Sequence, residues 1–64
     1  MPTGKVKFFD TAKCFGFIEW EGEELYVHAG DLIDLIKKND RVSFEIHEEN
    51  SKKSAYDVRK VKHG

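Results

Sequence analysis

Residues 15–28 read FGFIEWEGEELYVH, and this stretch decides the fold. Two runs with alternating side chains, Phe15–Trp20 and Leu25–His28, flank the segment Glu21-Gly22-Glu23-Glu24. Alternation with period two is typical of β-strands, and Gly22 can take the positive φ that a tight hairpin turn requires. The stretch therefore predicts an antiparallel β-hairpin.

Three further segments have strand character, namely Lys5–Phe9, Arg41–His47 and Ala55–Val61. Between the third and fourth strands, Asp31–Lys38 is the one helix-like stretch, with Asp31 at the N-cap position and apolar residues at i, i+3 and i+4. It is too short for a helix to stand alone, so we expect one or two turns that close one end of the sheet. The pattern predicts an all-β protein, either a small barrel or a strongly curled sheet.

Length and composition narrow the class of protein. The chain has 64 residues, one Cys and a formal net charge of −1. We expect residues 1–64 to form a single domain with a small core and no deep, enclosed pocket. One Cys excludes an intramolecular disulfide, and the absence of long apolar runs predicts a cytoplasmic protein with neither membrane span nor secretory signal. The net charge argues against indiscriminate binding to duplex nucleic acid, which usually needs a strongly basic domain.

The alternation divides the strand residues between two faces of the sheet. The expected inner core consists of apolar residues, namely Val6, Ile18, Leu25, Val27, Val42, Phe44 and Ile46. The outer face then carries Phe15, Phe17, Tyr26 and His28, with Lys5 and Lys7 beside them. Phe8 and Phe9 are adjacent, so one of them also points outward unless a bulge or bend intervenes.

Aromatic rings gathered on the solvated face of a small domain indicate an interaction surface. They suit a stacking platform on which the bases of a single-stranded nucleic acid lie while nearby lysines meet its phosphates. The charge pattern fits this interpretation, because the first lysines fall beside the rings and much of the acid lies around Gly22. The alternative is that the rings pack under a loop or against another subunit.

Three motifs resemble the cold-shock domain family: Gly4-Lys5-Val6-Lys7-Phe8-Phe9-Asp10, Lys13-Cys14-Phe15-Gly16-Phe17-Ile18 and Leu25-Tyr26-Val27-His28. The similarity runs from Gly4 to about Val61. It implies a five-stranded OB-fold barrel that binds single-stranded RNA or DNA, with a preference for pyrimidine-rich segments. It also implies a cytoplasmic RNA chaperone or antiterminator-like binder. Carried over by position, the resemblance assigns stacking to Phe8, Phe15, Phe17, Tyr26 and His28, phosphate or base-edge contacts to Lys7 and Lys13, and a core position to Phe9.

The chain departs from the family pattern in ways that bear on binding. Cys14 stands where the family usually has Gly, so a positive φ there would cost stability or reshape the turn. Phe8 replaces a Trp and Tyr26 a Phe, which keeps an aromatic face at both positions. The other departures are Ala29 in place of an aromatic, a shorter connection from Asp34 to Asp40, and Lys52-Lys53-Ser54 in place of Gly-Pro. Cys14, Ala29 and the shortened connection motivate a second hypothesis, an OB-fold protein-interaction module with weakened nucleic-acid binding. We expect the protein to be a monomer, with a dimer as the alternative.

Other kinds of site find little support. The candidate metal ligands Cys14, His28, His47 and His63 match no paired-ligand spacing, so we expect neither a metal nor a cofactor. The sequence shows no acid–base pair, nucleophile dyad or phosphate-binding loop, so we expect no enzymatic activity. Trp20 has the parity of Ile18, which predicts a core or rim position.

Overall fold

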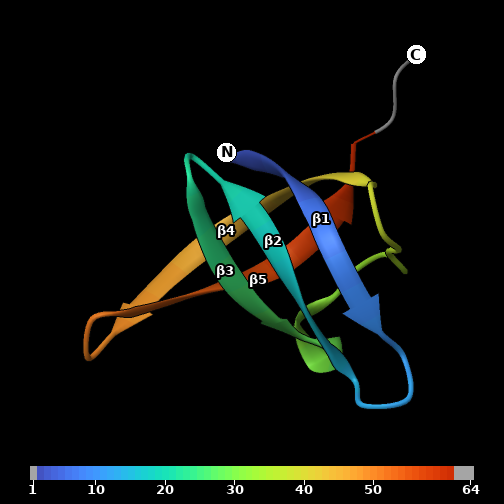
Figure 1. The fold of residues 1–64 in the computed structure, drawn as a ribbon, viewed down its shortest axis with the longest axis horizontal. Helices are drawn as coiled ribbons and strands as arrows, with labels where there is room; N and C mark the ends of the chain where they lie inside the picture. Colours follow the sequence, from blue (N-terminus) through green and yellow to red (C-terminus); the bar gives the residue numbers. More distant parts are fainter. Residues whose placement is uncertain (1, 62–64) are drawn as a thin grey trace.

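Five β-strands account for most of the computed structural model, which describes residues 2–61 (Figure 1). The strands are β1 (Thr3–Asp10), β2 (Phe15–Trp20), β3 (Glu23–His28), β4 (Arg41–Glu49) and β5 (Lys52–Lys60). They close into a barrel in the order β1-β2-β3-β5-β4, with β3 and β5 parallel and the other neighbours antiparallel. The all-β class and the small five-stranded barrel are thus confirmed, and the arrangement is consistent with an OB-fold.

The predicted hairpin forms between β2 and β3, with cross-strand partners running from Phe15 and His28 to Trp20 and Glu23. Glu21 and Gly22 have φ values of 48° and 77°, as in the two-residue turns with positive φ that suit the twist of a hairpin. This short turn fixes the register, so the aromatic residues of both strands share one face.

The core confirms most of the expected inner set. Six of its seven members have no exposed surface, and Ile46 is partly buried against them. The core also contains Ile36, Ala55 and Val58, which alternation did not identify. In β5 the reason is a register shift opposite Ser43–Glu45, where Asp57 takes a φ of 51°. This irregularity lets Ala55 and Val58 both point inward although they are three residues apart.

A bulge in β1 explains how Phe8 and Phe9 divide between the two faces. Val6 pairs with Ile18 and Phe8 with Phe17, so Lys7 is the extra residue between the two pairs. Lys7 and Phe8 are both exposed as a result, whereas Phe9 packs against the core as the family resemblance implied. The bulge brings an ammonium group and a ring to the same face.

The predicted short helical turn between β3 and β4 is present, but it does not lie over Asp31–Lys38 as expected. A single 3-10 turn, Ala29–Asp31, follows β3, and the side chain of His28 caps it. Asp31 is the last residue of this turn, not the N-cap of a helix. The amides of Ile33 and Asp34 instead donate to the carbonyl of Val58. Hydrogen bonds to β5 take the place of those that a short helix would form. The apolar spacing of this stretch instead reflects the burial of Ile36 in an irregular loop.

Cys14 ends the turn between β1 and β2 and has a φ of 62°. One carboxylate oxygen of Asp10 accepts hydrogen bonds from the amides of Ala12 and Lys13, at 3.0 and 3.1 Å, and so holds the turn. The left-handed conformation at Cys14 costs a residue with a Cβ about 1–2 kcal/mol. Cys14 therefore replaces the Gly of the family pattern at a position whose backbone conformation favours glycine.

Replacing Cys14 with Gly is expected to stabilise the protein by about 1 kcal/mol, because the relief of strain exceeds the added entropy of the unfolded chain. For a domain of this size, the gain corresponds to a rise of about 4–8 °C in the midpoint of thermal unfolding. Asn50→Gly is the matched control, since Asn50 also has a positive φ, 52°, but asparagine tolerates it. An equal gain in both variants would contradict strain at Cys14.

Candidate nucleic-acid interface

Four aromatic rings form one cluster on the outer face of β1, β2 and β3. Phe17 lies at its centre, with ring centroids 5.6 Å from Phe8, 6.1 Å from Phe15 and 6.0 Å from Tyr26. Phe15 and Tyr26 are stacked with an angle of 19° between their planes, and most other pairs meet edge to face. These contacts restrain the rings without covering them on the solvent side.

The cluster is open to solvent. Phe8 and Tyr26 are 37% and 41% exposed, and Phe15 and Phe17 are partly buried. Rings of this size are normally buried in a small domain, so a contiguous exposed group indicates a surface that binds something. The structure thus brings together Phe15, Phe17 and Tyr26, which alternation placed on this face. Phe8, which the sequence assigned to stacking only through the family resemblance, joins them.

His28 extends the cluster at the end of β3, where its cross-strand partner is Phe15. The ring is exposed, and its Nδ1 accepts a hydrogen bond of 3.0 Å from the amide of Gly30. This bond limits rotation of the imidazole. Because Nδ1 is the acceptor, the N–H of the neutral ring is at Nε2. The ring edge that carries Nε2 remains available to a ligand.

Lys7 and Lys13 differ in how free their ammonium groups are. Lys7 donates a hydrogen bond to Glu24 across the face, whereas Lys13 is exposed on the β1–β2 turn and forms no ion pair within residues 2–61. We expected much of the acid to lie around Gly22, apart from the first lysines. This prediction is wrong for Lys7, because Lys7 is paired with Glu24. The strand pairing brings Glu24 opposite Glu19, one step along the face from Phe17 and Tyr26. Lys7 and Glu24 are far apart in the sequence, so the sequence alone did not reveal that they are close in the fold.

The hydrogen bond with Glu24, and then its negative charge, raises the pKa of Lys7 above the ordinary value of 10.5. A raised pKa means that the pair stabilises the folded state below pH 10.5. This contribution is lost as the pH rises through the folded-state value. At neutral pH the ammonium is charged, but Glu24 already neutralises it in part.

Glu24→Gln is expected to tighten binding of a single-stranded oligonucleotide by up to about fivefold at low salt. The variant frees Lys7 from an exposed ion pair, which contributes little to stability, and removes a carboxylate beside the rings. Glu21→Gln makes the same change in net charge at the β2–β3 turn and serves as the control. Fluorescence titration measures both, and unchanged or weaker binding by Glu24→Gln would show that this carboxylate does not compete with phosphate.

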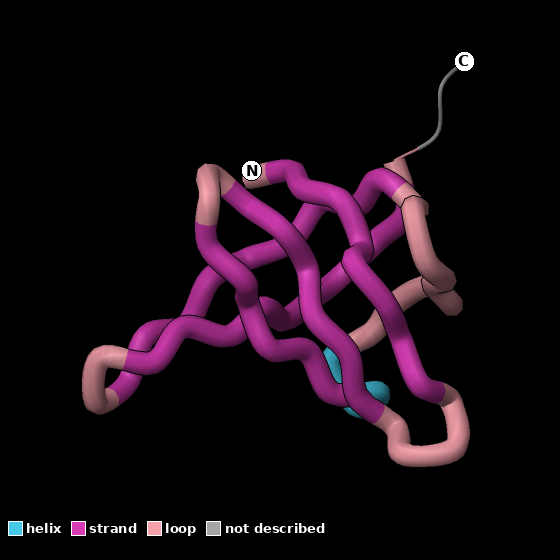
Figure 2. The backbone as a smooth tube through the Cα atoms, in the orientation of Figure 1, coloured by secondary structure: helices cyan, strands magenta, loops and turns pink. Residues whose placement is uncertain are grey.

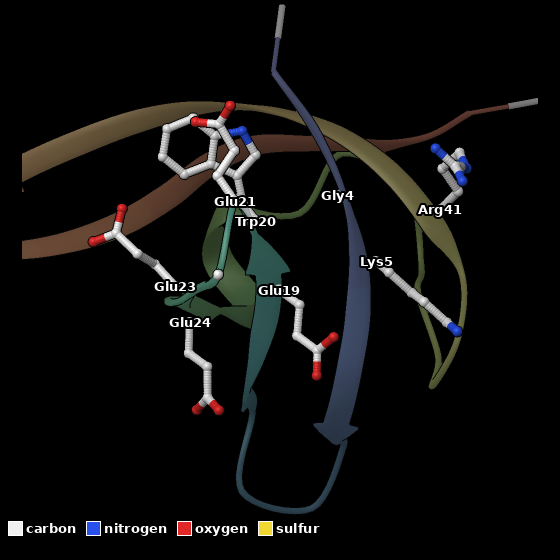
Figure 3. A pocket seen from close by; sticks show the side chains of 9 residues that line it. Gly4, Lys5, Glu19, Trp20, Glu21, Glu23, Glu24 and Arg41 are labelled. Atoms are coloured by element: carbon white, nitrogen blue, oxygen red, sulfur yellow. The ribbon is translucent and has the colours of Figure 1, made fainter.

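A set of charged residues lies at the β2–β3 turn, around Trp20. A shallow pocket of about 430 Å³ lies there. Figure 3 shows the carboxylates of Glu21, Glu23 and Glu24 on one side of β1 and the ends of Lys5 and Arg41 on the other. The indole packs against the core, as its parity predicted. The acids would repel phosphate, so this end marks a boundary of the aromatic face.

Lys53 links the β4–β5 hairpin to this end of the barrel. Its ammonium lies 5.9 Å from the centre of the Trp20 ring and 2.9 Å from a carboxylate oxygen of Glu23. The hydrogen bond to Glu23 raises the pKa of Lys53. The sequence showed an added lysine here, but only the folded hairpin pairs it with Glu23, so Lys53 is not free for a ligand.

Within residues 2–61, no three His, Cys, Asp or Glu side chains gather as metal ligands do. His63, one of the four metal candidates in the sequence, lies outside the described residues. The described part of the chain also contains no helix long and apolar enough to cross a membrane.

Comparison with known proteins identifies the family of this chain. Residues 2–61 match the "Cold-shock" DNA-binding domain family. The match spans nearly the whole chain, so the protein belongs to the cold-shock domain family, whose members bind nucleic acids and are not enzymes.

Relatives from Bacillus species match over nearly their whole length. The chain is 45% identical to the cold shock-like protein CspD of Bacillus cereus over 65 residues, which covers 94% of this chain and 98% of the relative. It is 42% identical to the cold shock protein CspD of Bacillus subtilis (strain 168), over 95% of this chain and all of the relative. A third relative, the cold shock-like protein CspE of Bacillus anthracis, is 41% identical over 92% of this chain and 96% of its own.

Proposed function

We propose that this protein binds single-stranded RNA or DNA on its outer aromatic face and holds it unpaired, as a cytoplasmic RNA chaperone or antiterminator-like binder does. Bases stack on the rings, and lysines at the margin contact the phosphates. The residues proposed for these roles are Lys7, Phe8, Lys13, Phe15, Phe17, Tyr26 and His28. The single observation that carries the proposal is the exposed four-ring cluster, whose central member is Phe17.

Stacking accounts for binding by a protein with a net charge of −1. Each base on an aromatic ring contributes about 1–3 kcal/mol, so four or five rings suffice without a large basic surface. Every base has a flat face, so sequence preference is modest, and we propose a preference for pyrimidine-rich segments. The acids around Trp20 discourage backbone contacts at that end, which keeps the bound strand away from the β2–β3 turn.

The salt dependence of oligothymidylate binding tests this division between stacking and charge. Two phosphate contacts, from Lys7 and Lys13, predict that log affinity falls with log salt with a slope of about −1.4 between about 50 and 200 mM salt. Lys13→Gln should reduce the slope by about half while most of the affinity remains. A steep slope together with no dependence on the rings would contradict a stacking platform.

The alternative function, a protein-interaction module, draws on the same exposed rings and on Ala29, where the family pattern has an aromatic. On this hypothesis a partner or a second copy of the chain covers Phe15 and Phe17. Sedimentation velocity at several protein concentrations, with and without oligonucleotide, separates the two functions. A dimer that binds no oligonucleotide at low salt would favour the interaction module.

A further inference from the structure

A line of cross-strand partners crosses the outer face of all five strands. Phe8 pairs with Phe17, Phe17 with Tyr26, Tyr26 with Ser54, and Ser54 with His47. The aromatic row therefore does not end at Tyr26. It passes over one small residue on β5 and resumes with an imidazole on β4.

His47 and Ser54 face the same side of the sheet as Tyr26. Phe44 and Ala55 are buried, so their neighbours of opposite parity, His47 and Ser54, point outward. The His47 side chain is 61% exposed. These residues lie in the β4–β5 hairpin, which continues beyond the rest of the barrel in the ribbon and tube views (Figures 1 and 2).

The small side chain of Ser54 leaves a groove between the two rings. Tyr26, Ser54, His47 and Lys52 are among its lining residues, and its volume is about 500 Å³. Strands two places apart in a sheet are separated by about 9.5 Å. A base in van der Waals contact with a ring on either side needs about 7–8 Å between them, so the groove has room for one base.

The charges around the groove favour a phosphate on one side of it. Lys52 is exposed and forms no ion pair among the described residues, whereas Lys53 is held by Glu23. Glu49 is the cross-strand partner of Lys52, but its carboxylate lies 3.6 Å from Nε2 of His47. A nucleotide would therefore turn its phosphate toward Lys52 and its base toward the imidazole.

We infer that the groove between Tyr26 and His47 is a further nucleotide subsite, in which a base stacks on His47 and Lys52 contacts its phosphate. The subsite rests on the proposed function, because it lengthens the same stacking row onto the β4–β5 hairpin. It takes a nucleotide of single-stranded DNA or RNA that continues past Tyr26.

Oligothymidylates of increasing length, from about four to about eight nucleotides, test the subsite against the wild-type protein and His47→Ala. Four nucleotides fill only the four-ring cluster, so both proteins should bind them equally. With the longest oligonucleotide, His47→Ala should bind about tenfold more weakly, in the lower part of the range for one base stack. His47→Phe should keep wild-type affinity, because it keeps a ring, and circular dichroism confirms that each variant is folded.

Oligonucleotides that lack one base supply a second readout. Moving a single abasic residue along the longest oligonucleotide should reveal one position whose removal weakens the wild-type protein but not His47→Ala. Equal affinity of both proteins at every length, with no such position, would overturn the subsite. If the shortest oligonucleotide fails to bind, or binds equally well to Phe17→Ala, the proposed function fails first and the subsite with it.

Discussion

Replacing Phe17 with alanine is expected to weaken oligothymidylate binding by about 1–3 kcal/mol, a loss of about five- to 150-fold. Phe17, like Phe15, contacts all three other rings, so its removal deletes one stacking surface and releases its three neighbours. Its side chain is only partly buried on the outer face, so we expect the barrel to remain folded. Isothermal titration calorimetry measures the loss.

Phe17→Tyr is the matched control, because it keeps the aromatic face and adds a hydroxyl that can point to solvent. It should bind with nearly wild-type affinity. Thermal unfolding of both variants checks that any change in affinity does not come from unfolding. Tight binding by a folded Phe17→Ala protein would mean that bases do not stack on this ring.

Gly16→Ala is expected to destabilise the protein by about 3 kcal/mol or more, a large part of the total stability of about 3–10 kcal/mol that a chain of this length has. A Cβ at Gly16 would lie 2.3 Å from the carbonyl oxygen of Phe8 and 2.8 Å from the Cα of Phe9. Both are backbone atoms, so β1 and β2 would have to separate. Urea unfolding followed by circular dichroism gives the change in the free energy of unfolding.

Gly30→Ala provides the comparison for this effect. A Cβ there would meet only the ring of His28, at 3.4 Å, which is an ordinary contact. The same substitution should therefore change stability by less than about 1 kcal/mol. If both variants lost a similar amount of stability, the close approach of β1 and β2 would not be the reason that position 16 requires glycine.

The sequence predicted the hairpin, the barrel and the aromatic face because strand alternation carries most of that information. Val6, Ile18 and Val27 were assigned to the core by parity alone, and each is fully buried. The same parity placed Phe17 and Tyr26 outside. Alternation failed where the strands are irregular, as at Asp57 in β5, because a bulge changes the parity of every residue beyond it.

Contacts between segments far apart in the chain could not be predicted. The pairing of Lys7 with Glu24 depends on the bulge in β1 and on the register of β2 with β3, so it needs the assembled sheet. The extension of the aromatic row to His47 likewise depends on the parallel pairing of β3 with β5. The loop that replaced the expected helix followed from hydrogen bonds to Val58, which sequence spacing does not reveal.

Amide and aromatic chemical shifts, recorded by NMR while a single-stranded oligonucleotide is added, test the central claim most directly. We expect the largest changes on the outer face of β1, β2 and β3, at Phe8, Phe15, Phe17, Tyr26 and His28, while residues around Trp20 change little. Changes confined to the Trp20 end, or no changes at low salt, would contradict the proposal that this aromatic face binds nucleic acid.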